Sequence, residues 1–117
     1  MSQQAKSWPA TTRESPDAAP GAALYRPTMG LTLYLVERYI SCLDAEALAR
    51  IEARLRRVTA ALRREGLDIH LVRSIALPGD DTCLCFFRAS DSDLVLEANR
   101  RAGLELERVV EALTAEL

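Results

Sequence analysis

The side chains best suited to chemistry in this sequence are its one histidine, His70, and a cysteine pair separated by a single residue, Cys83 and Cys85. Imidazole and thiolate are ligands that divalent transition metals favour, and carboxylates such as that of Glu37 serve as additional ligands. A C-x-C pair is a weaker metal signal than two C-x-x-C knuckles. The structural alternatives are a strand histidine near a sheet edge and small, buried cysteines. The hypothesis is a metal site drawn from His70, Glu37 and Cys85.

Other chemistry finds little support. The sequence contains no nucleophile–base pair, phosphate-cradling glycine loop or paired-carboxylate site above background, and one histidine leaves little for general acid–base work. We therefore favour a binding protein over an enzyme. The formal net charge of −2 gives no broad cationic field, which argues against a nucleic-acid partner.

The expected compartment follows from the cysteines and the apolar runs. The chain has an odd number of cysteines, 3, and its opening "MSQQAKSWPA" lacks the apolar core of a secretory signal. No apolar run approaches the roughly 20 residues needed to cross a bilayer. We expect a soluble, cytoplasmic protein with reduced thiols and no membrane partner.

Residues 1–28 differ in composition from the rest of the 117-residue chain. They are rich in proline, serine, threonine and alanine, and their few large apolar residues show no periodicity. The prediction is a disordered tail at 1–28 followed by one domain at 29–117. The alternative is a partner-binding segment anchored by Trp8 or Tyr25.

The elements that would position the candidate ligands follow from periodicity. Strands are expected at 31–40, 68–77, 82–89 and 106–113, although the Glu and Ala content of the last also allows a helix, and "PGDD" at 78–81 is typical of a tight hairpin connection. A helix is predicted from the N-cap Asp44 to Gly66, and a shorter one from Ser90 or Asp91 to Gly103. The long helix carries one apolar stripe, formed by Leu48, Ile51, Leu55, Val58 and Leu62.

The resulting order, β-α-β-β-α-β, predicts an α+β, ferredoxin-like sandwich. Right-handed crossovers place both helices on one face of a four-stranded antiparallel sheet. With the hairpin loop at 78–81, Ser74 pairs with Cys85 and Val72 with Phe87. One face is then predicted to carry His70, Val72, Ser74, Ala76, Cys83, Cys85 and Phe87, and the other Leu71, Arg73, Ile75, Leu84, Phe86 and Arg88.

Both predicted faces are largely apolar, and the helices can cover only one. We expect the face with Arg73 and Arg88 to be open, because an arginine keeps its head in water while its stem covers apolar surface. An open apolar face typically marks a partner surface. The inference is a homodimer.

The predicted positions also constrain the metal hypothesis. His70 and Cys85 lie about 13 Å apart along the sheet at 3.3 Å per residue, so a site using both has to be completed by a second chain. Glu37 and Arg38 point to opposite faces of a central strand. Glu37 therefore needs a cation, either a metal or an arginine, for which Arg73 and Arg88 are the candidates.

Three stretches, "LYLVERYI", "LVRSIALPGDDTCLCFFRASD" and "EANRRAGLELERVVEA", resemble the small bacterial proteins classified as domain of unknown function 4242. The resemblance covers residues 31–112 and is most specific at Val36–Arg38, at Arg73-Ser74, at Cys85 with Phe87, and at Arg101–Gly103. It implies a compact ferredoxin-like domain, and a nickel-binding member makes nickel the metal that the resemblance implies.

These observations together favour a small cytoplasmic homodimer that binds a small ligand or a divalent transition metal at the sheet face or the dimer interface. Two other functions stay open. One is a dimeric α+β-barrel enzyme of the monooxygenase or isomerase kind, which rests on fold analogy. The other is a protein-interaction module that docks through its tail.

Overall fold

A computed structural model of the chain describes residues 30–115. The predicted tail at 1–28 lies outside the described residues. The elements are strand β2 (Thr32–Tyr39), helix α3 (Ala45–Arg64), strand β3 (Ile69–Leu77), the 3₁₀ turn η2 (Pro78–Asp80), strand β4 (Thr82–Ala89), helix α4 (Ser92–Arg101) and strand β5 (Arg108–Ala112). This is the predicted β-α-β-β-α-β order.

Helix α3 begins and ends where the sequence predicts. The Asp44 carboxylate accepts a 2.8 Å hydrogen bond from the backbone N–H of Ala47, which satisfies a donor in the first turn. Gly66 follows the helix with φ of +90°, a left-handed conformation that favours glycine. Ile51, Leu55 and Leu62 on the apolar stripe are buried against the sheet.

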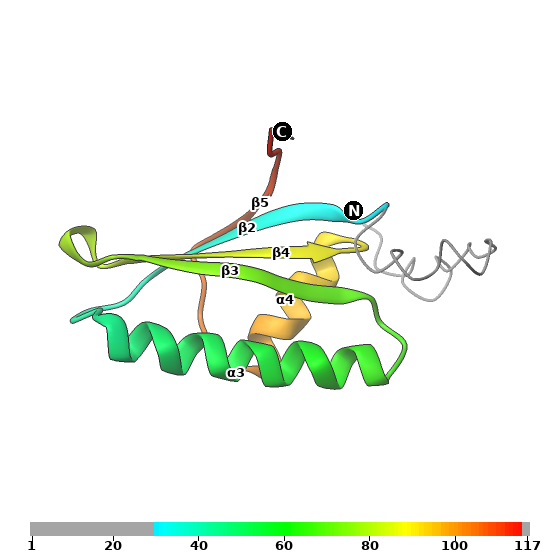
Figure 1. The fold of residues 1–117 in the computed structure, drawn as a ribbon, viewed down its shortest axis with the longest axis horizontal. Coiled ribbons are helices and arrows are strands. Elements are labelled where there is room, and N and C mark those ends of the chain that lie inside the picture. The colour runs from blue at the N-terminus through cyan, green and yellow to red at the C-terminus, as the bar shows by residue number, and fades with distance from the viewer. Residues whose placement is uncertain (1–29, 116–117) are drawn as a thin grey trace.

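The strand order is β3-β4-β2-β5, and every neighbouring pair is antiparallel. Figure 1 shows the sheet as one layer with α3 and α4 both beneath it. No helix among residues 30–115 covers the upper face, which we call the open face. The ferredoxin-like fold is confirmed.

Side chains alternate between the two faces along each strand. On the helix side, β2 and β4 contribute fully buried residues to the core, and α4 packs its own buried residues against them. The helix-side residues of β2 and β4 in this core are Val36, Cys83, Cys85, Phe87 and Ala89. The open face carries half-buried apolar side chains from all four strands, among them Leu35, Ile75, Leu84, Phe86 and Val110.

The predicted hairpin register holds only beside the turn. Ser74 pairs with Cys85 as predicted, but the register shifts between Leu71 and Arg73, so that Leu71, not Val72, pairs with Phe87. Val72 is the extra residue of a β-bulge and is 47% exposed. The predicted pairing of Val72 with Phe87 is therefore wrong.

The bulge exchanges the faces of the residues that precede it. Arg73, Ile75, Leu84, Phe86 and Arg88 lie on the open face as predicted. Leu71, however, is buried on the helix side, and His70, opposite Arg88, lies on the open face. The prediction that His70 shares a face with Cys85 is wrong, because one unpaired residue reverses the alternation.

Two arginines of α3 occupy the outer edge of β3. The Arg63 guanidinium donates to the Ile69 carbonyl at 2.7 Å, and Arg56 donates to the Leu71 carbonyl at 3.3 Å. These bonds satisfy backbone acceptors that an edge strand otherwise leaves open to a further strand. The arginines and the bulge together protect this edge from pairing.

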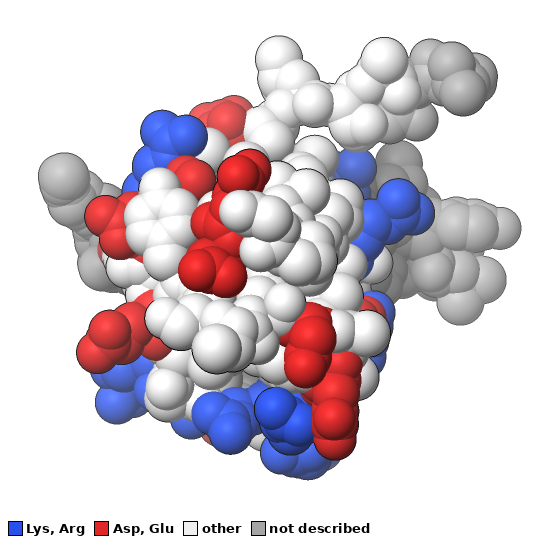
Figure 2. All heavy atoms as spheres, turned by 90° about the vertical axis from the view of Figure 1, so that its left-hand side faces the viewer, with Lys and Arg blue, Asp and Glu red and all other residues white. Residues whose placement is uncertain are grey.

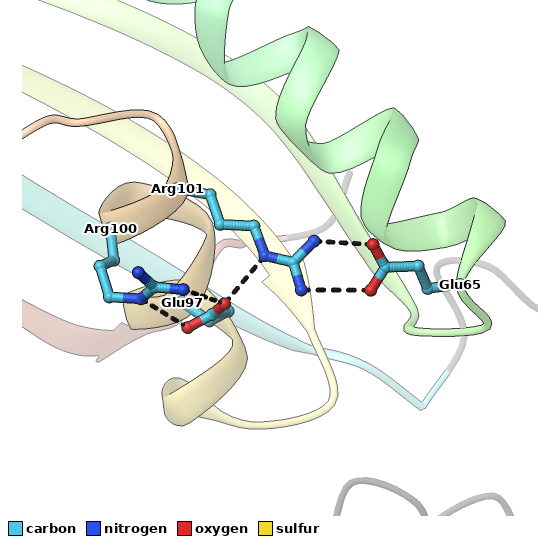
Figure 3. Close-up of polar contacts among 4 residues, drawn as sticks. All are labelled: Glu65, Glu97, Arg100 and Arg101. Carbon is cyan, nitrogen blue, oxygen red and sulfur yellow. Dashed lines mark hydrogen bonds and ion pairs between the residues drawn. The ribbon is translucent and has the colours of Figure 1, made fainter.

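An ion-pair cluster joins the two helices. Arg101 on α4 donates to both carboxylate oxygens of Glu65, just past α3, at 2.7 and 3.1 Å. It also donates to Glu97 at 2.8 Å, and Glu97 accepts two further bonds from Arg100 (Figure 3). The hydrogen bonds from these arginines lower the pKa of Glu97 to about 2.

The surface is mixed in charge. Figure 2 views the end of the molecule that holds the β3–β4 turn. Acidic side chains are spread over the middle of this end, and several basic ones gather along its lower, helix-side edge, so neither sign covers it continuously. Among the described residues, no helix is long and apolar enough to cross a membrane.

Candidate functional site

His70 lies at the open face near the edge of the sheet, paired with a carboxylate. Its Nε2 atom is 2.9 Å from Asp68 Oδ1, and the two side chains are 24% and 45% exposed. A carboxylate that binds one ring nitrogen fixes the orientation of the imidazole. The other nitrogen, Nδ1, can then bind a metal through its lone pair, as is usual for metal-binding histidines. Asp68 was not among the predicted ligands, although its place two residues before the histidine puts it on the same side of the chain.

Glu37 lies on the same open face, on the interior strand β2. Its carboxylate accepts a 2.8 Å hydrogen bond from Arg108 on β5 and a 3.4 Å bond from the Tyr39 hydroxyl. The sequence predicted an arginine or a metal beside Glu37 and named Arg73 and Arg88. The arginine is instead Arg108, which is opposite Glu37 in the β2–β5 register.

Cys85 lies on the other side of the sheet. It is fully buried beneath the helices, whereas His70 and Glu37 belong to the open face. One chain therefore does not bring the three predicted ligands to one ion. Across residues 30–115 there is no group of three or more His, Cys, Asp or Glu side chains that could hold a metal.

Besides the open-face pairs of His70 with Asp68 and Glu37 with Arg108, a polar cluster is buried around Arg38, which the sequence did not predict. This side chain is 1% exposed and points from β2 toward α4. It donates to Asn99 Oδ1 at 2.6 Å and to the Glu105 carbonyl at 3.0 Å, and it contacts Cys85 Sγ at 3.8 Å. Its Nε has no hydrogen-bond partner. The only sequence signal was the alternation that sends Arg38 to the face opposite Glu37.

The thiols of Cys83 and Cys85 lie 3.9 Å apart in this cluster. The pKa of Cys85 is lowered to about 6, chiefly by a hydrogen bond from Cys83, then by one from Ser74 and by the charge of Arg38, against the effect of burial. The pKa of Cys83 is raised by its hydrogen bond with Cys85 and by burial. Cys85 is thus the thiol that holds a negative charge more readily. Cys42, by contrast, is exposed in the loop before α3.

The fold and the two polar clusters define a small ferredoxin-like α+β protein with one covered and one open sheet face. Residues 34–112 match the family described as nickel responsive protein SCO4226-like, and the chain belongs to this family. The crystal structure of SCO4226 from Streptomyces coelicolor A3(2) is similar, with a TM-score of 0.59 and 16% sequence identity over 71% of this chain and 99% of that one. The similarity in structure shows the shared fold. No curated protein matches the chain.

Proposed function

We propose that this chain is a cytoplasmic, homodimeric protein that binds nickel or a related divalent transition metal, with His70 as its imidazole ligand. The observation that carries the proposal is the 2.9 Å contact between His70 Nε2 and Asp68. It orients the ring and leaves Nδ1 with no hydrogen bond among the described residues. The family description, which names nickel responsiveness, supports nickel as the ion.

The open face supports the homodimer. Its half-buried apolar side chains include Leu84 and Phe86 at the centre, with Arg73, Arg88 and Arg108 around them. Stacking this face on a second copy removes its apolar surface from water, and the arginine heads can remain solvated at the rim. Within residues 30–115, no helix covers the open face, so a second copy can pack there.

A dimer also addresses the incomplete donor set. One chain offers a single imidazole, which Asp68 orients, and this is fewer ligands than a tightly bound divalent ion needs. In a face-to-face dimer, a second copy supplies its own open-face ligands, among them Glu37 on the interior strand β2. Nickel binding and self-association are then linked by mass action.

The test is calorimetric titration of tag-free protein with nickel, together with sedimentation with and without the ion. His70→Ala should weaken nickel binding at least tenfold, because the chain has no other imidazole. Asp68→Asn should weaken it by about tenfold, the lower end for loss of an orienting partner. Cys42→Ser, which removes an exposed thiol, is the control and should bind nickel as the wild type does.

Nickel should also tighten the wild-type dimer. Equal affinities for the wild type and His70→Ala would remove His70 from the site. A wild type that gives no heat with nickel would overturn the metal function. A wild type that stays monomeric with and without nickel would overturn the shared site.

A further inference from the structure

The buried cluster around Arg38 on the helix side takes no part in the nickel site proposed for the open face. Cys83 and Cys85 lie on the same side of β4, both are fully buried, and their sulfur atoms are 3.9 Å apart. Two metal–sulfur bonds of about 2.3 Å each reach sulfur atoms up to about 4.6 Å apart. The observed separation of the two sulfurs therefore lies within the reach of one ion.

Arg38 brings a positive charge into the same cluster. Its acceptors are the amide oxygen of Asn99, the carbonyl of Glu105 and the sulfur of Cys85, and its Nε has none. Among the described residues, no carboxylate forms an ion pair with it. A buried guanidinium that lacks a counter-charge is costly, so the cluster favours an anionic partner next to Arg38.

We propose that Cys83 and Cys85 form a buried dithiolate site for a soft, monovalent metal ion of the Cu(I) type, with Arg38 as its resident counter-charge. In the binding step both thiols lose their protons to the buffer, two metal–sulfur bonds form, and the product is a bis(thiolate) complex of charge −1. The guanidinium neutralises that charge. No electron is transferred.

The same charge balance selects against divalent ions. Two thiolates, Arg38 and a divalent ion carry a net charge of +1 in a buried site, and within residues 30–115 no carboxylate or imidazole joins the two thiols as a third ligand. The Ser74 hydroxyl donates a hydrogen bond to Cys85 Sγ at 3.5 Å and, among the hydrogen bonds of the described residues, is the one further oxygen that contacts the two thiols. Thiolates are also the ligands that soft ions prefer. Nickel and Cu(I) are thus assigned to opposite faces of the sheet.

The experiment is anaerobic competition of the reduced full-length protein against a chromophoric Cu(I) chelator. The wild type should take one Cu(I) per chain and melt at a higher temperature with the ion bound. Cys83→Ser and Cys85→Ser should each weaken binding at least 100-fold. Cys42→Ser, which removes an exposed thiol, and His70→Ala should both bind Cu(I) as the wild type does.

X-ray absorption at the copper edge of the wild type tests the ligands directly, even if a core variant fails to fold. Two sulfur neighbours and no nitrogen are expected. The proposal is overturned if copper is bound through nitrogen or oxygen, if Cys42→Ser abolishes binding, or if excess nickel displaces Cu(I). His70→Ala should lose nickel binding and keep Cu(I) binding. Failure of the wild type to bind Cu(I) therefore leaves the nickel proposal intact.

Discussion

Asn99 on α4 accepts a 2.6 Å hydrogen bond from Arg38 on β2, a residue 61 positions earlier in the chain. Both side chains are 1% exposed. The Asn99 amide in turn donates to the Val95 carbonyl at 2.8 Å, which fixes its orientation. This contact ties the second helix to the central strand through a buried charge.

Asn99→Ala should therefore be strongly destabilising. The substitution removes the acceptor of the shortest hydrogen bond that the buried Arg38 guanidinium makes. Leaving a buried charged donor without its acceptor lowers the free energy of unfolding by about 2–4 kcal/mol. Urea denaturation at neutral pH measures the loss. Leu96→Ala, at an exposed position of the same helix, is the control and should cost much less. Equal losses in the two variants would show that the Arg38 contact contributes little.

Periodicity predicted the fold well because each element has an unambiguous pattern. The apolar stripe of α3 and the Asp44 and Gly66 boundaries are local signals, and the structure retains them. The bulge at Val72 left no such signal. Bulges are often marked by glycine, and a β-branched valine instead favours a regular strand. The error at His70 follows from that one residue.

The partners of the candidate ligands depend on tertiary structure. Glu37 could be assigned a cationic partner from its central position, but the choice of Arg108 depends on the register of a five-residue strand. Asn99 meets Arg38 only because α4 packs beneath the sheet (Figure 1), and no spacing in the sequence encodes that packing. Sequence reasoning could thus predict the need for a partner more readily than its identity.

Phe86→Glu should break the proposed dimer and leave the monomer folded. Phe86 lies on the open face opposite Leu35 and Arg73, outside the helix-side core. Stacking two copies would strip water from a carboxylate that replaces the aromatic ring at the centre of the face, so self-association should weaken at least 100-fold even with Arg73 opposite it. Sedimentation equilibrium measures this, and circular dichroism checks the fold. Leu96→Glu on α4 is the control and should dimerise normally.

Deletion of residues 1–28 should leave the thermal midpoint nearly unchanged. The segment is rich in proline and holds few large apolar residues, so its composition supports little burial of apolar surface. Calorimetry of the full chain and of residues 29–117 makes the comparison. A fall of more than about 5 °C, which corresponds to roughly 1 kcal/mol in a domain of this size, would mean that the segment stabilises the domain.

Glu97→Gln should destabilise the protein at neutral pH and much less in acid. In the folded protein the arginines hold the pKa of Glu97 at about 2, below its ordinary value of 4.5. A carboxylate whose pKa is lowered by folding stabilises the folded state above the ordinary pKa, and that contribution disappears as the pH falls toward the folded pKa. The difference between wild type and Glu97→Gln should be on the order of 1 kcal/mol at pH 7, since the pairs lie near solvent. It should shrink steadily from pH 4.5 toward pH 2 and also in high salt. Urea titrations at several pH values measure this difference in the free energy of unfolding.

The matched control is Glu46→Gln, which removes a single exposed pair with Arg50 at 3.5 Å and should change stability little at any pH. A wild-type advantage over Glu97→Gln that stayed constant down to pH 2 would show that the cluster between the helices acts through packing instead of charge.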